Sequence, residues 1–393
     1  MKILHITPGV DERTGGPAYV ALGLCQALAR KGLDITLFTT NIDCNGPSGV
    51  PLGQPITHNG VKLHFFPVSH PRSYVYSPQL GRAISRTCSD FDLVHIHGTW
   101  CYPQAIGCYI ARKNHVPYIV RPRANLRRFA LRIHRLRKTI YALLIERRNL
   151  NHAAAIQFYD SEEMEDARQF GVRSRPIFVP NGVEPVADDH LALLKGRFRS
   201  RCPDLVDKRI VLFLGRIAAI KGLDRLVWAF RDVVQVCPDC RLVLAGPDNE
   251  GFSTQVRRWL QQAGLSEHTT FTGHLSGDDK TSAFVDADVF CMSSHQEGHS
   301  CALKEALMCG LPAVVTHEIG FDDLVKYSVG IRTNSNPADL AKGLLTILTD
   351  ATLRRQMGQR ARELILSKYT WDKVAEELIT DYEQIVGSTS LRK

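Results

Sequence analysis

Long apolar runs are absent from this sequence. No uninterrupted apolar stretch approaches the ~18 residues that a membrane-spanning helix needs. The chain opens with Met1–Ile6, which is typical of a strand, and no basic leader followed by an apolar segment precedes it. We therefore expect neither a standard secretion signal nor a spanning anchor. The expected location is the cytoplasm, either free or on the inner face of the membrane.

Cysteine pairs at metal-ligand spacing are also scarce. The eleven cysteines are scattered, and the C-x-x-C pair Cys237 and Cys240 has no second pair near it. This pair lies between an expected helix and an expected strand, which disfavours a zinc or redox centre. We expect free, reduced thiols and no bound metal.

The sequence has fewer acidic residues than basic residues. The 49 lysines and arginines against 40 aspartates and glutamates leave a formal charge of +9. This excess suits an anionic partner, such as a nucleotide, a phosphorylated lipid or a membrane surface, although it also serves solubility alone. A nucleic-acid groove is disfavoured because the basic segments lack interleaved exposed aromatic residues.

The length and the hydrophobic pattern predict two α/β domains. A chain of 393 residues exceeds what one core usually supports. Apolar, β-branched runs alternate with helical patterns, which is typical of a parallel sheet covered on both faces. Strands are expected at Lys2–Thr7, Asp34–Thr40, Lys62–Phe66, Leu93–Ile96, Tyr118–Val120, Ala154–Phe158, Arg209–Leu214, Arg241–Ala245, Phe271–Thr272, Asp288–Met292 and Ala313–Thr316. Helices are expected at Pro17–Arg30, Pro78–Cys88, Tyr102–Asn114, Arg127–Asn151, Ser161–Phe170, Lys221–Val236 and from Asn336 onward, with Ser161 as a cap.

The glycine-rich turn after the first strand is not the dinucleotide fingerprint. Pro8-Gly9 is followed by Gly15-Gly16-Pro17, and this spacing does not match G-x-G-x-x-G. A hydride-transferring dehydrogenase is therefore disfavoured. Glycines before a helix let a backbone approach a ligand and offer N–H groups to an anion, but a structural turn needs the same residues.

Two cations follow the first strand of the second half. Gly215-Arg216 stands at the end of this strand, and Lys221-Gly222 follows just before the next helix. No metal-binding Asp-x-Asp stands beside them. Side chains of this kind at the carboxyl end of a strand could neutralise a leaving diphosphate, although a surface Arg and Lys are more often solvated.

The segment Glu297–Pro312 carries two carboxylates, Glu297 and Glu305, eight positions apart. Glu297 lies in the loop before a helix, and Glu305 is expected about two turns into that helix. Carboxylates accept paired hydrogen bonds from vicinal hydroxyls, which ribose and sugars present. The helix start, at Gly298, His299 and Ser300, offers backbone donors to phosphate. Because the helix is largely apolar, its glutamate needs a partner, which favours ligand contact.

Two histidines end a strand in the first half. In His95-Ile96-His97-Gly98, alternation places His95 and His97 on one side, with His97 on the carboxyl-terminal lip. Such histidines are commonly structural. With the glutamate motif expected across a cleft, we favour a substrate contact for His97.

Together these motifs resemble the retaining glycosyltransferases of the large family four, which have the two-domain GT-B fold. The matching pieces, in family order, are Gly15-Gly16, His95-x-His97-Gly98, Pro180-Asn181-Gly182-Val183, Gly215-Arg216 with Lys221-Gly222, Ala245-Gly246-Pro247, and Glu297-x7-Glu305 with Cys309-Gly310-Leu311-Pro312. The resemblance covers most of the chain. It implies an acceptor domain at residues 1–182, completed by a terminal helix at 371–393, and a donor domain at 183–370.

The resemblance also implies the reaction. A sugar would pass from a nucleoside-diphosphate sugar to a saccharide or lipid-linked acceptor, with retention of configuration and without metal or cofactor. The implied donor-binding residues are Gly15, Gly16, Arg216, Lys221, Gly246, His274, Gly298, His299, Ser300 and Glu305. The implied catalytic residues are His97, Arg123 and Glu297. An epimerase on the same fold and an inactive nucleotide-sugar-binding scaffold are the alternatives.

Arg123 departs from the family pattern. It stands where many relatives have a histidine, and an arginine cannot act as a general base at neutral pH. The residue could instead bind an anionic group of the acceptor.

A basic segment follows Arg123. At ~100° per residue, its apolar side chains share one face of a helix and its basic side chains cluster opposite. The apolar residues are Phe129, Ile133, Leu136, Ile140, Leu143 and Leu144, and the basic residues are Arg127, Arg128, Arg132, Arg135 and Lys138. The pattern suits a helix lying on an anionic membrane, and equally one that packs on the sheet with its arginines solvated.

Overall fold

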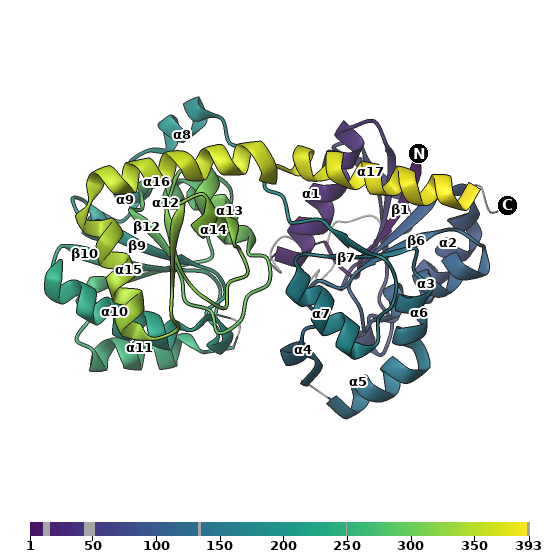
Figure 1. Cartoon of the computed structure of the whole chain (residues 1–393), viewed down its shortest axis with the longest axis horizontal. Helices are drawn as coiled ribbons and strands as arrows, with labels where there is room; N and C mark the ends of the chain where they lie inside the picture. Colours follow the sequence, from purple (N-terminus) through teal and green to yellow (C-terminus); the bar gives the residue numbers. More distant parts are fainter. Residues whose placement is uncertain (11–15, 43–51, 133–134, 249, 391–393) are drawn as a thin grey trace. The chain divides into compact units, whose positions relative to one another are not determined.

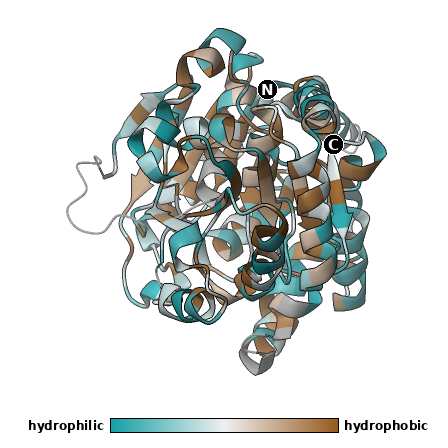
Figure 2. Ribbon diagram, turned by 90° about the vertical axis from the view of Figure 1, so that its left-hand side faces the viewer, coloured by the Kyte–Doolittle hydropathy of each residue, from teal (hydrophilic) through white to brown (hydrophobic). Residues whose placement is uncertain are grey.

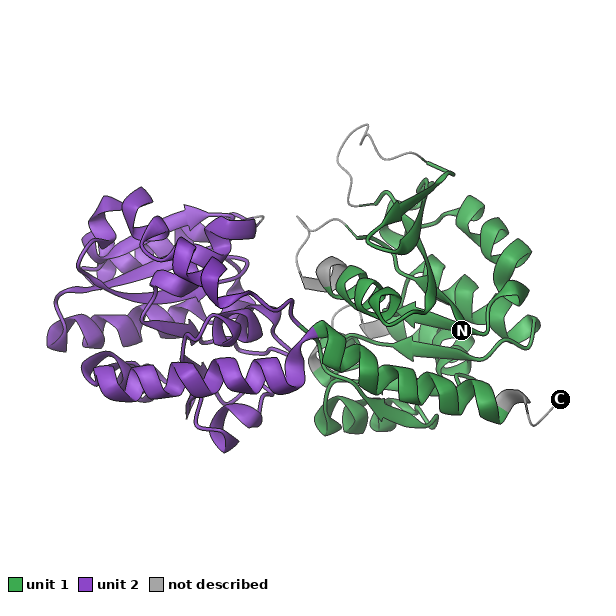
Figure 3. Ribbon diagram, turned by 90° about the horizontal axis from the view of Figure 1, so that it is seen from above, with its two compact units in different colours: residues 1–182, 371–393 green, residues 183–370 purple. Residues whose placement is uncertain are grey.

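The structure is a computed structural model that describes residues 1–10, 16–42, 52–132, 135–248 and 250–390. The chain divides into two compact units. Unit 1 comprises Met1–Gly182 and Trp371–Lys393, and unit 2 comprises Val183–Thr370 (Figure 3). Each unit is an α/β domain around its own sheet, as the hydrophobic pattern predicts (Figure 1).

The sheet of unit 1 has the order β3-β4-β2-β1-β5-β6-β7-β8, parallel throughout except that β3 runs antiparallel to β4. Its strands are β1 (Lys2–Ile6), β2 (Asp34–Thr40), β3 (Pro55–His58), β4 (Val61–Phe66), β5 (Leu93–His97), β6 (Tyr118–Arg121), β7 (Ala155–Phe158) and β8 (Pro176–Phe178). Its helices are α1 (Gly16–Arg30), α2 (Pro78–Thr87), α3 (Tyr102–Lys113), α4 (Arg128–Arg132), α5 (Arg135–Tyr141), α6 (Arg147–Asn151), α7 (Ser161–Phe170) and α17 (Trp371–Ser390).

The sheet of unit 2 is parallel, with the order β11-β10-β9-β12-β13-β14. Its strands are β9 (Arg209–Leu214), β10 (Cys240–Ala245), β11 (Thr269–Gly273), β12 (Val289–Met292), β13 (Ala313–Thr316) and β14 (Gly330–Thr333). Its helices are α8 (Asp188–Leu194), α9 (Arg197–Arg201), α10 (Leu223–Val236), α11 (Ser253–Gln262), α12 (Gly277–Asp286), α13 (Cys301–Met308), α14 (Asp323–Lys326), α15 (Pro337–Thr349) and α16 (Ala351–Leu364).

Both faces of the second sheet are buried, which explains its continuous apolar strands. Along β9, Ile210 and Leu212 belong to one hydrophobic cluster, and Val211 and Phe213 belong to the other. The strands β10, β12 and β13 and the surrounding helices and loops supply the remaining residues of each cluster. The helices carry both hydrophobic and hydrophilic residues along their length (Figure 2). An amphipathic helix buries only the stripe that faces the sheet.

The terminal helix α17 closes unit 1. Trp371 at its start is fully buried, and Gly23 and Gly182 leave the space that the indole fills. Ion pairs then fasten the outer side of the helix, Arg30 to Asp372 at 2.7 Å and Lys31 to Glu376 at 2.7 Å. Unit 1 is thus built from two separate parts of the chain, Met1–Gly182 and Trp371–Lys393.

The structure differs from the sequence expectations in several local features. Asp160, not Ser161, caps α7, because its carboxylate accepts the N–H of Glu163. The expected helix Arg127–Asn151 contains α4, α5, a π-helical segment at Ala142–Glu146 and α6, with residues 133 and 134 outside the described part. The short strands β3, β8 and β14 and the helices α8, α9, α11, α12 and α14 were not expected.

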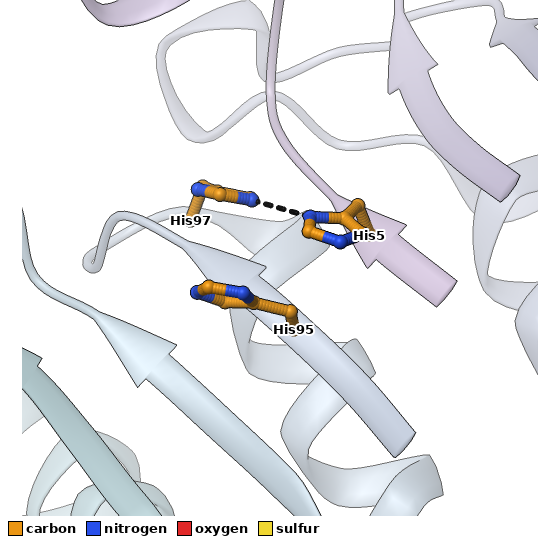
Figure 4. A group of neighbouring side chains, drawn as sticks. All are labelled: His5, His95 and His97. Atoms are coloured by element: carbon orange, nitrogen blue, oxygen red, sulfur yellow. Dashed lines mark hydrogen bonds between the residues drawn. The ribbon is translucent and has the colours of Figure 1, made fainter. Parts of the chain in front are cut away.

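Three histidines lie on one buried face of the first sheet (Figure 4). His5 on β1 stands beside His95 on β5, and His97 lies two residues further along β5. The His5 Nδ1 and His97 Nε2 atoms are 2.9 Å apart, and the His95 and His97 rings stack with centroids 4.5 Å apart. The His95 Nδ1 atom is 2.5 Å from the Tyr382 hydroxyl of α17. All three imidazoles are fully buried.

Burial keeps these imidazoles neutral. Loss of hydration lowers the pKa of His5 to about 3, and it lowers the pKa values of His95 and His97 well below the ordinary value. Neighbouring charges, including those of Arg121 and Arg123, lower the pKa values of His95 and His97 further.

The histidine cluster makes stability depend on pH. Below about pH 6.5 the unfolded imidazoles bind protons that the folded ones do not, so stability falls as the pH falls toward 3. Each such ring contributes up to about 1.4 kcal/mol per pH unit. We expect His5→Gln to flatten the decline of the unfolding free energy between pH 6.5 and pH 4, measured by denaturant titration. The exposed control His58→Gln should keep the wild-type slope, and equal slopes in all three proteins would contradict this account.

Candidate functional site

The loop before α10 brings a lysine to the first glutamate of the carboxylate motif. Lys221 ends a short 3-10 turn, and the next residue, Gly222, has a positive φ of 63°. A Cβ at Gly222 would overlap the carbonyl oxygen of Ser293, so only glycine permits this approach. The Ser293 hydroxyl also donates to the Gly222 carbonyl at 2.8 Å. The loop is thereby fixed against the end of β12, and the Lys221 ammonium forms an ion pair with Glu297.

A second close backbone approach lies at the end of β10. Gly246 has φ 147°, and a Cβ there would overlap the carbonyl oxygen of Gly215. The Gly215 N–H donates to the Ala245 carbonyl at 2.9 Å. These contacts hold together the carboxyl ends of β9 and β10, where α/β sheets usually bind ligands.

The helix α13 positions the second glutamate. Ser300 caps this helix, since its hydroxyl accepts the Leu303 N–H at 3.3 Å. Glu305 is the fifth residue of α13, so it lies little more than one turn in, not the two turns expected. Its carboxylate pairs with Lys280 of α12 at 2.8 Å. Both glutamates of the motif are therefore partly buried and paired with a lysine.

The motif contains a buried lysine whose role the sequence reasoning missed. Lys304 is 1% exposed, and its ammonium lies 2.7 Å from His299 Nδ1 and 4.5 Å from the ring centre of Tyr369. An ammonium only donates, so His299 Nδ1 accepts and the ring proton lies on Nε2. His299 thus has a defined tautomer at the start of α13. The residues around His299 and Lys304 are Gly298, Ser300, Leu303, Ile319, Gly320 and Phe321.

Two expected donor residues lie at exposed positions. Arg216 is half exposed, and its guanidinium is 3.7 Å from Glu250. His274 is exposed after β11. Among the described residues, neither of these side chains forms a hydrogen bond or an ion pair with Lys221 or Glu297.

In unit 1, the loop after β6 is clamped onto α7. Arg123 and Ala124 both have positive φ values, 60° and 62°. The buried carboxylate of Glu163 accepts the Ala124 N–H at 2.6 Å and the Tyr159 N–H at 2.9 Å. These bonds stabilise an otherwise strained backbone, and strained loops of this kind cluster at functional sites.

The other expected residues of unit 1 lie as follows. Gly16 opens α1, and Gly15 lies outside the described residues. His97 ends β5, as expected, but it is fully buried against His5 and not exposed on a lip. Its contact with substrate stays a prediction.

The structure corrects the interpretation of the basic segment in one respect. Arg127 is only 5% exposed and forms ion pairs with Asp160 and Glu162 at 2.6 Å, so it is not a membrane-surface residue. The acidic start of α7, close in space, holds it. Arg128 is exposed and pairs with Asp166 at 3.0 Å. The structure does not describe the side chains of Arg132 and Arg135.

The predicted apolar face of this segment is exposed in its second half. Ile140, Leu143 and Leu144 are 52%, 62% and 71% exposed. The π-helical segment Ala142–Glu146 contains both leucines, and such a segment changes the angular position of the residues after it. Packing of this face on the sheet is therefore contradicted at these positions. Lys138, on the same segment, lies 5.6 Å from the centre of the Trp100 ring. In the described part of the chain, no helix has the length and apolar character to cross a membrane.

Comparison with known proteins identifies both units. Residues 15–182 match a glycosyl transferase 4-like domain, and residues 199–364 match the glycosyl transferases group 1. An uncharacterised glycosyltransferase of Methanocaldococcus jannaschii is 25% identical over 98% of each chain. A phosphatidyl-myo-inositol mannosyltransferase of Mycobacterium tuberculosis is 31% identical over 55% of this chain and 56% of its own.

Solved structures share the fold over the whole chain. Sucrose-phosphate synthase from Thermosynechococcus elongatus has a TM-score of 0.77 and 19% identity, covering 98% of this chain and 99% of its own. The Anabaena protein HepE, solved with UDP and glucose, has a TM-score of 0.75 and 15% identity, covering 98% of this chain and 100% of its own. The fold is therefore GT-B, and the chain belongs to the group 1 glycosyltransferases.

Proposed function

We propose that this glycosyltransferase moves a sugar from a nucleoside-diphosphate sugar to a saccharide or lipid-linked acceptor, with retention of configuration and without a metal ion. The observation that carries the donor assignment is the arrangement at α13 in unit 2. There two partly buried carboxylates, Glu297 and Glu305, are each paired with a lysine beside a capped helix start. The HepE structure, solved with UDP and glucose, supports a nucleotide donor on this fold.

Each group has a role in this proposal. Glu305 accepts hydrogen bonds from the ribose hydroxyls, and Glu297 accepts them from the transferred sugar. Lys221 and Arg216 neutralise the diphosphate as negative charge develops on it, which lowers the barrier to its departure. The backbone N–H groups at Gly298, His299 and Ser300 complete the phosphate site.

The proposed stereochemical outcome is retention of configuration. The departing phosphate takes the proton of the acceptor hydroxyl, so the new bond forms on the face that the diphosphate leaves. Arg123 and His97 in unit 1 orient the acceptor, and neither acts as the general base. The configuration of the product, read from its anomeric proton by NMR, distinguishes retention from inversion.

The two cations can be tested together. We expect Arg216→Gln with Lys221→Gln to lower kcat by ~10²–10³-fold, since removal of one donor to a developing charge commonly costs that much. The measurement is steady-state release of nucleoside diphosphate from the donor that the protein turns over. Replacing Arg257, a cation of α11 stacked 3.9 Å from the Phe271 ring, with Gln provides a matched control in unit 2. Turnover at the wild-type rate in the double variant would remove the proposed phosphate site.

We also propose that the protein binds the anionic inner face of the membrane through the exposed end of its basic segment. The apolar side chains of Ile140, Leu143 and Leu144 are mostly exposed, and Arg147 and Arg148 follow on the same helical stretch. Apolar residues with flanking cations suit a helix lying at the surface of anionic lipid. The name of the mycobacterial relative, a phosphatidyl-myo-inositol mannosyltransferase, supports an acceptor with a lipid anchor.

Membrane binding has a direct test. Leu143→Gln with Leu144→Gln should reduce cosedimentation with vesicles of mixed phosphatidylglycerol and phosphatidylcholine by at least tenfold, because burial of two leucines contributes ~3 kcal/mol or more. Leu193, which is 78% exposed on α8 of unit 2, provides the control Leu193→Gln. If the double variant and the control bind vesicles as the wild type does, the segment is not the membrane contact.

A further inference from the structure

A buried guanidinium stands at the carboxyl end of β6. Arg121 is 1% exposed, and its Nη2 donates to Asn181 Oδ1 at 2.7 Å. Its charged plane lies 4.9 Å from the ring centre of Tyr159. The Nε and Nη1 atoms have no hydrogen-bond partner among the described residues. A buried cation with unsatisfied donors is costly, so this site suits a ligand that supplies both acceptors and negative charge.

The surroundings of Arg121 add little negative charge. Its register partner His97 and the adjacent His95 are neutral because they are buried. The described part of the chain shows no ion pair to Arg121. Of the nearby acids, Glu163 accepts two backbone N–H groups and Asp160 pairs with Arg127.

A second cation, Arg123, also affects the buried histidines electrostatically. The charge of Arg123 lowers the pKa values of His95 and His97, as the charge of Arg121 does. The charge of Arg123 also lowers the pKa of the buried Cys25 thiol of α1, although burial has the larger effect and raises that pKa overall. The charges of Arg121 and Arg123 therefore both affect His95 and His97, and the bond from Ala124 N–H to Glu163 fixes the backbone of the loop that carries Arg123.

A metal ion is the competing occupant, and the charges disfavour it. The ligand atoms of His5, His95 and His97 lie within 4.8 Å of one another, which is close enough to consider a cation. However, the nearby guanidinium groups of Arg121 and Arg123 would repel a divalent ion, and His5 and His97 already bond to each other at 2.9 Å. The charges favour an anion.

We propose that Arg121 and Arg123 bind an oxyanion of the acceptor, a phosphate or a carboxylate. The fork of a guanidinium matches the two oxygens of either group. The position suits a ligand, because the carboxyl ends of parallel strands form the ligand side of an α/β sheet. This inference rests on the proposed function, in which unit 1 binds the acceptor, and it narrows the acceptor to an anionic molecule.

The test uses the full chain and three probes: inorganic phosphate, a hexose 6-phosphate and a hexuronate, each compared with the neutral hexose in calorimetry and thermal unfolding. We expect at least one anionic probe to bind and the hexose to show no binding. Arg121→Gln should weaken that binding by at least tenfold. It should also raise the melting temperature of the ligand-free protein, because it removes a buried cation without a counter-charge.

Controls separate this site from the donor site and from a structural role. Arg128→Gln, an exposed arginine paired with Asp166, and Arg257→Gln, outside both proposed sites, should both keep the affinity for the anionic probe. If Arg121→Gln lowers the melting temperature and leaves the affinity unchanged, Arg121 is structural and the proposal is overturned. Should Arg121→Gln not fold, Arg121→Lys decides: loss of affinity supports the site, and unchanged affinity overturns it.

Failure of this inference and failure of the proposed function give different results. A protein that binds a nucleoside diphosphate and none of the anionic probes overturns the oxyanion site alone. A protein that binds the anionic probes and no nucleoside diphosphate overturns the donor assignment alone.

Discussion

Charges that are partly or fully buried must be compensated, and this requirement organises both candidate sites. In unit 2, Lys221 and Lys280 are paired with Glu297 and Glu305, and Lys304 lies against the accepting nitrogen of His299. In the proposed donor site, a ligand phosphate or hydroxyl would replace part of each of these contacts. A preformed site of this kind needs little reorganisation when charge develops on a leaving group.

In unit 1, the buried charge of Arg121 has no oppositely charged partner among the described residues. The buried face of this unit carries three neutral imidazoles and the guanidinium of Arg121, which donates a hydrogen bond to the neutral side chain of Asn181. The sheet and α17 enclose these groups, since Tyr382 of α17 contacts His95 directly. Lys221 and Lys280 of unit 2 thus have carboxylate partners, whereas Arg121 of unit 1 has none among the described residues, and in our proposal a ligand supplies the negative charge.

The sequence predicts well those features that depend on local pattern. The strands β2, β9 and β13 have the predicted bounds because each is rich in apolar and β-branched residues. The edge strand β3 escapes detection because it is mostly exposed and lacks a buried face. The capping residue of α7 was wrong by one position, since Ser161 and Asp160 both favour caps and only the backbone geometry decides between them.

In the candidate sites, too, residues within a short local motif could be predicted, whereas contacts that depend on tertiary packing could not. The two glutamates and Lys221 could be selected from spacing, because they fall within short, ordered motifs. The lysine partner of Glu305 could not be selected in this way. Lys280 meets Glu305 only after α12 and α13 pack, and no local pattern indicates this contact. The burial of Arg127 and Arg121 likewise depends on long-range contacts, with α7 and with Asn181. One local signal was available, since His5 is a polar residue within the apolar strand β1.

The central claim is that unit 2 holds a metal-independent nucleoside-diphosphate-sugar site. The most direct measurement is the thermal unfolding of the full chain with uridine, guanosine and adenosine diphosphates and their sugars, with and without EDTA. A ligand that binds the folded state raises the melting temperature by mass action. The account predicts that one base and its diphosphate sugar raise the melting temperature, and that EDTA leaves this shift unchanged. Absence of a shift with every nucleotide, or a shift abolished by EDTA, would contradict it.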